Sequence, residues 1–510
     1  MKTQLTTVLA AALCCGPALA DEAVDAARAW RQAHAVEILS GFSEFLSIPN
    51  VASDLPNIER NAAYIREHLE ARGATVELWR QEGVPPIVFG LLPAAGATRT
   101  VGIYMHYDGQ PVVPEQWTHS PWEPTLYDAS MEAGGRPRPM PQTGETIDPE
   151  WYLYARGAGD DKAPLPAILG ALDALAEAGI DRTVNLLFFF EGEEEAGSPH
   201  LETYMREHRA ALDVDLWLIC DGPVHQSRQP QLVFGVRGVT GFEITVYGAN
   251  RTLHSGHYGN WSPNPALALA KLLGSMKDVD GNVIVEGFYD DTVKAGPGER
   301  AALAALPPID DALRHELALA PEGTDGDGAL LAERLLLPSL NIRGFVSGAV
   351  GAGARNIVPN QATASLDIRM VKANDPERMI DVVERHIESQ GYVIVRGEPD
   401  AETRRAHPLL ARIVREHGYP AARTSLDDPK GAWAVAAARR AAGDDLLLVP
   451  SLGGSLPLYL FNNILGSPVV IVPIANHDDN QHAPDENLRL ANLWDGIDLM
   501  AALFTGTGEL

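Results

Sequence analysis

The spacing of apolar residues changes between two periods along the chain, and the order of these periods predicts an α/β fold. Segments with apolar residues three and four positions apart predict helices, and short, mostly apolar runs predict strands. The helix-like segments are 36–46, 57–72 and 165–178, and the strand-like runs are 74–79, 86–92, 100–105, 183–190 and 214–220. The run 183–190 is almost wholly apolar, as in strands buried within a mostly parallel sheet. Strands and helices in alternation predict an α/β sandwich.

A different pattern begins near Gly238. Strand-like and helix-like segments follow in the order β-α-β-β-α-β, at 241–247, 264–276, 340–343, 362–370, 376–390 and 392–396. This order predicts a small antiparallel sheet with helices on one face. From about Pro408 the pattern returns to helices and apolar strands, among them 469–473. We therefore expect a larger α/β domain, formed by 21–237 and 399–510, into which an α+β domain, 238–398, is inserted. The stretch 277–336 is rich in Ala, Pro and Gly, and its pattern assigns it no role.

The first twenty residues have the order of a secretory signal peptide. Lys2 precedes a mostly apolar run from Leu5 to Cys15, and Ala18-Leu-Ala20 provides small residues before Asp21. The apolar run is too short to cross a bilayer, and no later stretch reaches the necessary length. Cleavage after Ala20 leaves Cys220 as the single cysteine, so no internal disulfide is expected. These features predict a periplasmic or secreted protein without a membrane span.

The composition is that of a globular protein with room for two or three domains. The chain has 510 residues, of which 45% are hydrophobic and 21% are charged. Its formal net charge of −28 argues against nucleic acid or an anionic membrane as the main partner. The charge does not exclude a small anionic substrate, because one local arginine can outweigh a distant net field.

Acidic residues and histidines stand just past the ends of several predicted strands. His106 and Asp108 follow the run 100–105, Glu191 to Glu195 follow 183–190, and Asp221 follows 214–220. The pair His477 and His482 lies in a polar loop after 469–473. Asp160 and Asp161 lie in a Gly-containing turn before the helix 165–178. Open α/β sheets bind ligands at the carboxyl edge of their strands, where the loops meet. We therefore expect these side chains to converge.

Each of these residues has an ordinary explanation when it is taken alone. Asp160 and Asp221 can cap helices, a histidine at a strand end is usually only hydrogen-bonded, and an acidic run is usually solvated. Taken together, several carboxylates with two histidines and no cysteine are typical of a hydrolytic two-zinc site, with Co²⁺ or Mn²⁺ as substitutes. A carboxylate at a turn such as Asp160 can offer one oxygen to each of two cations ~3.5–4 Å apart.

The motifs between His106 and His482 resemble those of the M20 metallopeptidases, nearest to the carnosine-dipeptidase and carboxypeptidase-like branch. The resemblance covers nearly all of the chain after residue 20. It implies a zinc-peptidase-like catalytic sandwich with an inserted, ferredoxin-like α+β lid domain that forms a homodimer.

The resemblance also implies a role for each matched residue. His106 and Asp221 would bind one zinc ion, Glu195 and His482 the other, and Asp160 both, while Asp108 orients His106 and Glu194 is the general base. On the lid, His254 within Thr252-Leu-His254-Ser-Gly256 would reach across the dimer to polarise the scissile carbonyl. The substrate's carboxylate end would contact Arg369 and the loop Gly453, Gly454 and Ser455.

The implied reaction is hydrolysis of dipeptides or C-terminal peptide bonds by a hydroxide formed between two zinc ions. An N-acyl amino acid deacylase would use the same metal core and is the alternative. A non-catalytic binding protein is a third class, disfavoured because the base and the ligands are all present. Ser451 and Leu452 stand where the family usually has an arginine before the Gly-Gly-Ser loop. This departure leaves the recognition of the substrate's end, and with it the substrate itself, open.

Overall fold

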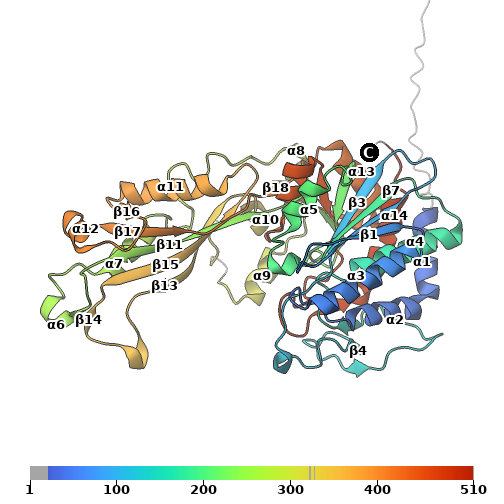
Figure 1. Cartoon of the computed structure of the whole chain (residues 1–510), viewed down its shortest axis with the longest axis horizontal. Helices are drawn as coiled ribbons and strands as arrows, with labels where there is room; N and C mark the ends of the chain where they lie inside the picture. The colour runs from blue at the N-terminus through green and yellow to red at the C-terminus, as the bar shows by residue number, and fades with distance from the viewer. Residues whose placement is uncertain (1–20, 321–322, 327, 509–510) are drawn as a thin grey trace, which may run out of the picture.

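The computed structural model describes residues 21–320, 323–326 and 328–508. A larger and a smaller unit lie side by side along the long axis of the molecule (Figure 1). Within the described ranges, no helix is both long enough and apolar enough to cross a membrane. The signal peptide expected at 1–20 lies outside the described residues.

The larger unit is built on an eight-stranded sheet with the order β1-β2-β7-β3-β8-β20-β9-β19. The strands are β1 (Thr75–Trp79), β2 (Ile87–Leu92), β3 (Thr100–His106), β7 (Asn185–Glu191), β8 (Leu216–Ile219), β9 (Gln231–Val233), β19 (Leu447–Val449) and β20 (Val469–Ile471). The four central strands, β7, β3, β8 and β20, are parallel, whereas β2 and β9 run antiparallel to their neighbours in that group. The carboxyl ends of the four central strands therefore share one edge.

Helices bury both faces of this sheet. They are α1 (Glu22–Ala33), α2 (Ala35–Leu46), α3 (Leu55–Glu70), α4 (Pro164–Ala178), α5 (Leu201–Glu207), α13 (Pro429–Ala442) and α14 (Leu490–Phe504). Alternate residues of β3 enter different cores: Ile103 packs with α4 and α14, and Tyr104 packs with α5 on the opposite face. A Cβ on Gly102 would lie 2.5 Å from the Trp217 ring, so this position accepts only glycine.

A separate four-stranded sheet has the order β21-β6-β4-β5 and joins two distant loops. Its strands are β4 (Thr125–Tyr127), β5 (Pro137–Arg138), β6 (Tyr152–Tyr154) and β21 (Asn487–Arg489). The turn with Asp160 follows β6, and the loop with His482 precedes β21. Because β6 and β21 pair antiparallel, with Tyr154 opposite Asn487, the two loops leave the sheet at the same end.

The smaller unit has a five-stranded sheet with the order β13-β15-β11-β17-β16. The strands are β11 (Gly238–Tyr247), β13 (Ser339–Val346), β15 (Gln361–Met370), β16 (Val393–Val395) and β17 (Leu410–Arg415), and the main helices are α7 (Pro265–Gly274) and α11 (Pro376–Ser389). Phe242 and Ile244 of β11 point to the face that both helices cover. The expected α/β sandwich with an inserted ferredoxin-like unit is confirmed.

One strand of the smaller unit has a different position from the one we expected. The predicted run 392–396 forms β16, an edge strand that pairs parallel with β17. β17 takes the place beside β11, in the antiparallel register Ile244 opposite Ile413. The run 392–396 is short and half-buried, whereas β17 brings Ala411 and Ile413 into the core. The domain limits of 238–398 stay a prediction, and the sheet that begins at Gly238 ends at Arg415.

The remaining elements are short. They are β10 (Gly235–Val236) with β18 (Ala422–Arg423), β12 (Leu253–His254) with β14 (Ile357–Val358), and the helices α6 (Ser255–Tyr258), α8 (Pro297–Ala305), α9 (Asp310–Glu316), α10 (Leu331–Arg334) and α12 (Ala401–Ala406). Figure 1 places α9 and α10 where the two units meet, and α6 with β14 at the far end of the smaller unit.

Candidate metal centre

Histidines and carboxylates converge at the carboxyl edge of the large sheet, as the strand order requires. Two groups place one ligand atom from each member within 4.8 Å of the others: His106, Asp160 and Asp221 form one, and Asp160, Glu195 and His482 form the second. Asp160 belongs to both. The sequence therefore brings together all five residues that were expected to bind metal, from β3, the turn after β6, and the loops after β7, β8 and β20.

Asp160 lies between two imidazoles. Its Oδ1 is 2.9 Å from His106 Nε2, and its Oδ2 is 3.2 Å from His482 Nε2. The His482 ring also lies 3.2 Å from Glu195 Oε2, while Asp221 Oδ2 is 3.7 Å from His106 Nε2. A carboxylate whose two oxygens face two separate ligand groups has the arrangement of a bridging ligand.

The electrostatics of the two groups reflect buried negative charge. Burial raises the pKa of Asp221 to about 7, and the nearby His106 only partly offsets this. Hydrogen bonds to Asp160 and Glu195 raise the pKa of His482 to about 10. Asp221 Oδ2 is buried and has no hydrogen-bond partner within the described part of the chain. Because a buried anion without a partner is costly, these residues fit divalent cations.

Asp108 holds the segment that carries the two glutamates. Its Oδ1 and Oδ2 accept hydrogen bonds from the backbone nitrogens of Glu194 and Glu195, each at 3.0 Å. The His106 ring contacts Asp108 mainly through the backbone oxygen, at 3.1 Å from Nδ1, while the carboxylate is 3.5 Å away. Asp108 therefore acts on the glutamates as much as on the histidine that we expected it to orient.

Glu194 stands beside both ligand groups at the start of a short 3-10 turn, Glu194–Ala196. Burial raises the pKa of its carboxyl well above the usual value, and Asp221 and Glu191 add to the effect although His106 opposes it. Glu193 points elsewhere and binds the backbone nitrogen of His200 at 2.9 Å. Glu193 is therefore separated from the neighbouring Glu194 and Glu195, to which the resemblance assigned roles.

The sequence patterns missed several polar partners of these residues. Gln481 Nε2 donates to Asp160 Oδ2 at 2.8 Å, and Gln110 Nε2 donates to Glu195 Oε2 at 2.7 Å. Glu486 accepts from the backbone nitrogen of Asp160 and binds Arg156, and both side chains are buried. The only sign of the two glutamines in the sequence was their position. Gln110 lies two residues after Asp108, and Gln481 lies one residue before His482.

The predicted substrate-binding residues form a second group where the two units meet. Arg369 of β15 donates from Nη1 to Ser455 Oγ at 2.8 Å. Arg237 donates its backbone N–H to Gly454 O at 3.1 Å, which fixes the Gly453-Gly454-Ser455 loop against the start of β11. Arg369 and the loop were predicted separately, and the fold joins them.

His254 does not join these groups within one chain. It is exposed on β12, its Nδ1 accepts a hydrogen bond from the backbone nitrogen of Gly256 at 3.0 Å, and its ring lies 4.7 Å from that of His257. The helix α6, which begins at Ser255, lies at the end of the smaller unit that is farthest from the larger one (Figure 1). A role for His254 at the metal centre therefore requires a second copy of the chain.

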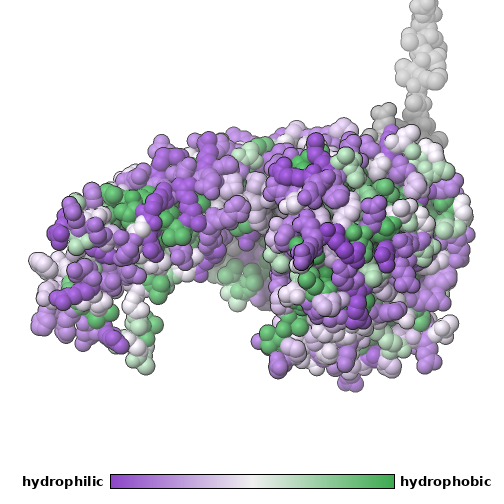
Figure 2. Space-filling view, in the orientation of Figure 1, coloured by the Kyte–Doolittle hydropathy of each residue, from purple (hydrophilic) through white to green (hydrophobic). Residues whose placement is uncertain are grey.

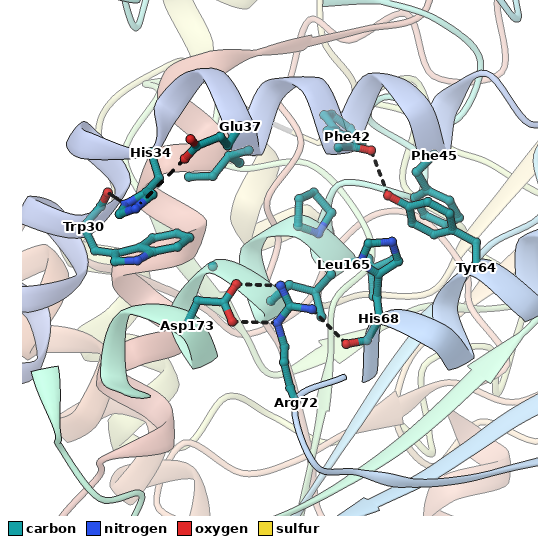
Figure 3. A pocket seen from close by; sticks show the side chains of 15 residues that line it. Trp30, His34, Glu37, Phe42, Phe45, Tyr64, His68, Arg72, Leu165 and Asp173 are labelled. Carbon is teal, nitrogen blue, oxygen red and sulfur yellow. Dashed lines mark hydrogen bonds and ion pairs between the residues drawn. The ribbon is translucent and has the colours of Figure 1, made fainter. Parts of the chain in front are cut away.

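A different cavity, of about 210 Å³, lies among α1, α2, α3 and α4. Figure 3 shows that its charged groups face one another: Arg72 Nε donates to Asp173 Oδ1 at 2.8 Å, and His34 stacks on Trp30. Since its arginine is already neutralised, this cavity offers few free polar groups to a ligand. The candidate site is therefore the carboxyl edge of the large sheet.

An open α/β sheet with paired carboxylate and histidine groups at its carboxyl edge fits the class of metal-dependent hydrolases. The family model for peptidase family M20/M25/M40 matches residues 102–505. The chain belongs to this family, and both the resemblance and the prediction of a metallopeptidase-type hydrolase are confirmed. Members of the family depend on metal ions.

Two curated relatives match most of the chain. The Cys-Gly metallodipeptidase of Schizosaccharomyces pombe is 26% identical over 91% of this chain and 94% of its own. The β-Ala-His dipeptidase of Homo sapiens is 26% identical over 91% of this chain and 87% of its own. Among solved structures, an M20 metallo-carboxypeptidase from Sulfolobus solfataricus has a TM-score of 0.71 and 27% identity, covering 92% of this chain and 98% of that one.

The prediction of a periplasmic or secreted protein is wrong. The Cys-Gly metallodipeptidases of three yeasts, which match about nine tenths of this chain, are cytosolic-type enzymes. The prediction rested on Lys2, the short apolar run from Leu5 to Cys15, and the small residues Ala18 and Ala20. Such a run is weak evidence, because Ala and Leu are also the strongest helix formers.

Proposed function

We propose that this chain is a metal-dependent dipeptidase. One observation carries the proposal: Asp160 belongs to two ligand groups, and Glu194, whose carboxyl is held beside them, is available as a base. The relatives named for Cys-Gly and β-Ala-His dipeptides support dipeptides as the substrate class. The S. solfataricus structure, named for a carboxypeptidase, supports cleavage of C-terminal peptide bonds as a related activity.

The proposed cofactors are two Zn²⁺ ions, with Co²⁺ or Mn²⁺ as substitutes. His106 and Asp221 would hold one ion, Glu195 and His482 the other, and Asp160 both. Carboxylate and imidazole ligands without cysteine suit catalytic zinc. When bound, such a pair supplies a Lewis acid for the carbonyl and lowers the pKa of a water molecule towards about 7.

Glu194 is the proposed general base. Asp108 fixes its backbone by accepting a hydrogen bond from the Glu194 nitrogen at 3.0 Å. A carboxylate held in this way next to Glu195 can take a proton from water. The same carboxyl then delivers the proton to the leaving amine. General acid–base catalysis of this kind contributes about 10²–10⁴-fold to the rate.

Arg369 and Ser455 are the proposed contacts for the substrate's carboxylate. Arg369 presents a planar guanidinium that pairs well with a carboxylate, and its hydrogen bond to Ser455 directs it towards the Gly453-Gly454 loop. The site is completed, in this proposal, by His254 from a second copy. The edge strand β13 exposes Ile342, Phe345 and Val346, which supports a homodimer through the smaller unit.

A substrate panel tests the proposal. Dipeptides, N-acetyl amino acids and a longer peptide are incubated with the enzyme, with and without a chelator, and the products are quantified. We expect dipeptides to be hydrolysed fastest and the chelator to stop turnover, with recovery on addition of Zn²⁺. Faster release of acetate from N-acetyl amino acids would show a deacylase instead, and turnover that resists the chelator would contradict the metal centre.

A further inference from the structure

The segment 277–336, to which the sequence pattern assigned no role, packs against the larger unit beside the metal centre. Its helix α8 lies against β19 of the large sheet. Leu335, just after α10, has its side chain 3.2 Å from the position that a Cβ on Gly453 would occupy. Arg237 Nη2 donates to Leu337 O at 2.8 Å. These contacts fix the end of the segment against the loop proposed to hold the substrate's carboxylate.

A cavity of about 440 Å³ lies between this segment and the larger unit. Leu303, Leu306, Ile309, Leu331 and Leu335 contribute to the wall on the side of the segment. The opposite wall includes Pro223, Val224, Val449 and Leu452. The wall on the side of the segment is therefore largely apolar, whereas the opposite wall also carries polar side chains: His225, Gln226, Gln231, Ser451 and His477. The volume falls within the ~300–1,000 Å³ typical of small-molecule sites.

The wall on the larger unit includes parts of two loops that carry candidate metal-ligand residues, the loop after Asp221 and the loop that leads to His482. Pro223 follows Asp221 by two residues, so the cavity begins within roughly 7 Å of chain from that carboxylate. Val224 donates its N–H to Ala475 O at 2.8 Å, which ties this wall to the loop that ends at His482. Leu452 lies 3.5 Å from the position of a Cβ on Gly222.

Apolar side chains remain exposed at this cavity. Leu330 and Leu331 are 47% and 42% exposed, and Asp310 Oδ1 fixes the backbone nitrogen of Leu331 at 2.8 Å. Figure 2 shows hydrophobic surface between the two units, in the place where Figure 1 draws α9 and α10. Exposed leucines beside a catalytic edge indicate a surface that a ligand covers.

We propose that this cavity is the specificity pocket for the substrate's C-terminal residue and takes a bulky apolar side chain, such as that of Phe or Leu. The proposal rests on the proposed dipeptidase function. The C-terminal residue is indicated because the cavity borders Gly453, in the loop proposed to hold that residue's carboxylate. Apolar specificity follows from the leucine-rich wall, since burying an apolar side chain of this size against it favours binding.

The test compares kcat/KM for Ala-Phe, Phe-Ala and Ala-Gly in the full-length, metal-loaded enzyme. The wild type is expected to prefer Ala-Phe over Ala-Gly by more than about tenfold. The variant Ala304→Trp places an indole in the cavity from α8, and it should lower the ratio of Ala-Phe to Ala-Gly by at least about tenfold. Leu331→Ser removes part of the apolar wall and should lower the same ratio by about fivefold.

Ala305→Trp is the matched control, because Ala305 is also exposed on α8 but does not line the cavity. It should keep the wild-type ratio. The pocket would be overturned if the Ala-Phe to Ala-Gly ratio of both cavity variants stayed within about twofold of the wild-type ratio. It would also be overturned if the cavity variants lowered kcat/KM for Phe-Ala alone. A wild type that hydrolyses none of the three dipeptides would instead refute the proposed function.

Discussion

Glu486 accepts a hydrogen bond from the backbone nitrogen of Asp160 at 2.9 Å, although 326 positions separate the two residues. The other carboxylate oxygen of Glu486 binds Arg156 Nη1 at 2.5 Å, and Arg156 Nη2 reaches Ala483 O at 3.2 Å. The buried pair thus connects the turn that carries Asp160 to the residue after His482. These contacts position the residue shared by both ligand groups.

We expect Glu486→Gln to weaken metal binding by about 10–100-fold, because residues that orient metal ligands have effects of this size. The measurement is a titration of the metal-free protein by calorimetry, together with activity at rising Zn²⁺ concentration. Activity should recover at high Zn²⁺. The control is Glu150→Gln, since Glu150 also binds an arginine, Arg489, but is half exposed. Equal affinities in Glu486→Gln and the wild type would contradict the role.

Glu194→Gln should lower kcat by about 10²–10⁴-fold while the metal content stays unchanged, because the amide cannot take a proton. Glu193→Gln serves as the control, since the Glu193 carboxylate binds His200 at 2.9 Å and faces away from the ligand groups. Steady-state kinetics and metal analysis of the same preparations give both quantities. A Glu194→Gln enzyme with substantial turnover would remove Glu194 from the role of base.

His254 is expected to act in the site of a second copy, because its own chain holds it at the far end of the smaller unit. His254→Ala and Glu194→Gln should each be nearly inactive. Co-refolding or co-expression of the two variants should restore roughly a quarter of the wild-type activity, since half of the dimers would carry one intact site. Persistent inactivity of the mixture would exclude this exchange.

Glu384 of α11 should stabilise the smaller unit in a pH-dependent way. Burial alone would raise its pKa, but hydrogen bonds from Arg396 Nη1 at 2.7 Å and Arg415 Nε at 3.0 Å outweigh burial and lower the pKa. The stabilisation is therefore present above the unfolded-state pKa of about 4.3 and is lost as the pH falls through the lower folded-state value.

Glu384→Gln should therefore reduce the free energy of unfolding at pH 7 by about 1–3 kcal/mol. The difference from the wild type should shrink as the pH falls below about 4 and through the lowered folded-state pKa, because the Glu384 carboxyl is then protonated in the folded protein as well as in the unfolded chain. Urea denaturation at several pH values measures it. Glu202→Gln, which breaks an exposed pair with Arg206, should change stability by less than about 1 kcal/mol at any pH. A pH-independent effect of Glu384→Gln would contradict the account.

Local patterns were sufficient to predict where the candidate metal-ligand residues converge. His106 and Asp221 follow strands whose apolar runs are continuous, and parallel strands bring their carboxyl ends to one edge. The local pattern of the smaller unit predicted its two main helices and four of its five strands, β11, β13, β15 and β16. The strand that it did not predict is β17, which lies between β11 and β16, because pairing in a sheet depends on long-range burial that a local run of residues does not reveal.

Contacts between distant segments were beyond the reach of local patterns. In the sequence, Glu486 is one more polar residue in a loop. Its contact with the turn that carries Asp160 depends on the pairing of β6 with β21. The segment 277–336 has no periodic pattern that indicates docking, and only the fold places Leu335 beside Gly453. Arg369 and Ser455 were predicted from separate motifs, and their hydrogen bond depends on how the two units meet.

The central claim is that Asp160 is shared by two divalent cations in a dipeptide-hydrolysing enzyme. Anomalous diffraction at the zinc absorption edge, from crystals of enzyme with measured dipeptidase activity, tests it most directly. We predict two peaks ~3.5–4 Å apart, one beside His106 and Asp221 and one beside Glu195 and His482, with Asp160 between them. A single peak, or a pair that Asp160 does not contact, in an active enzyme would contradict the claim.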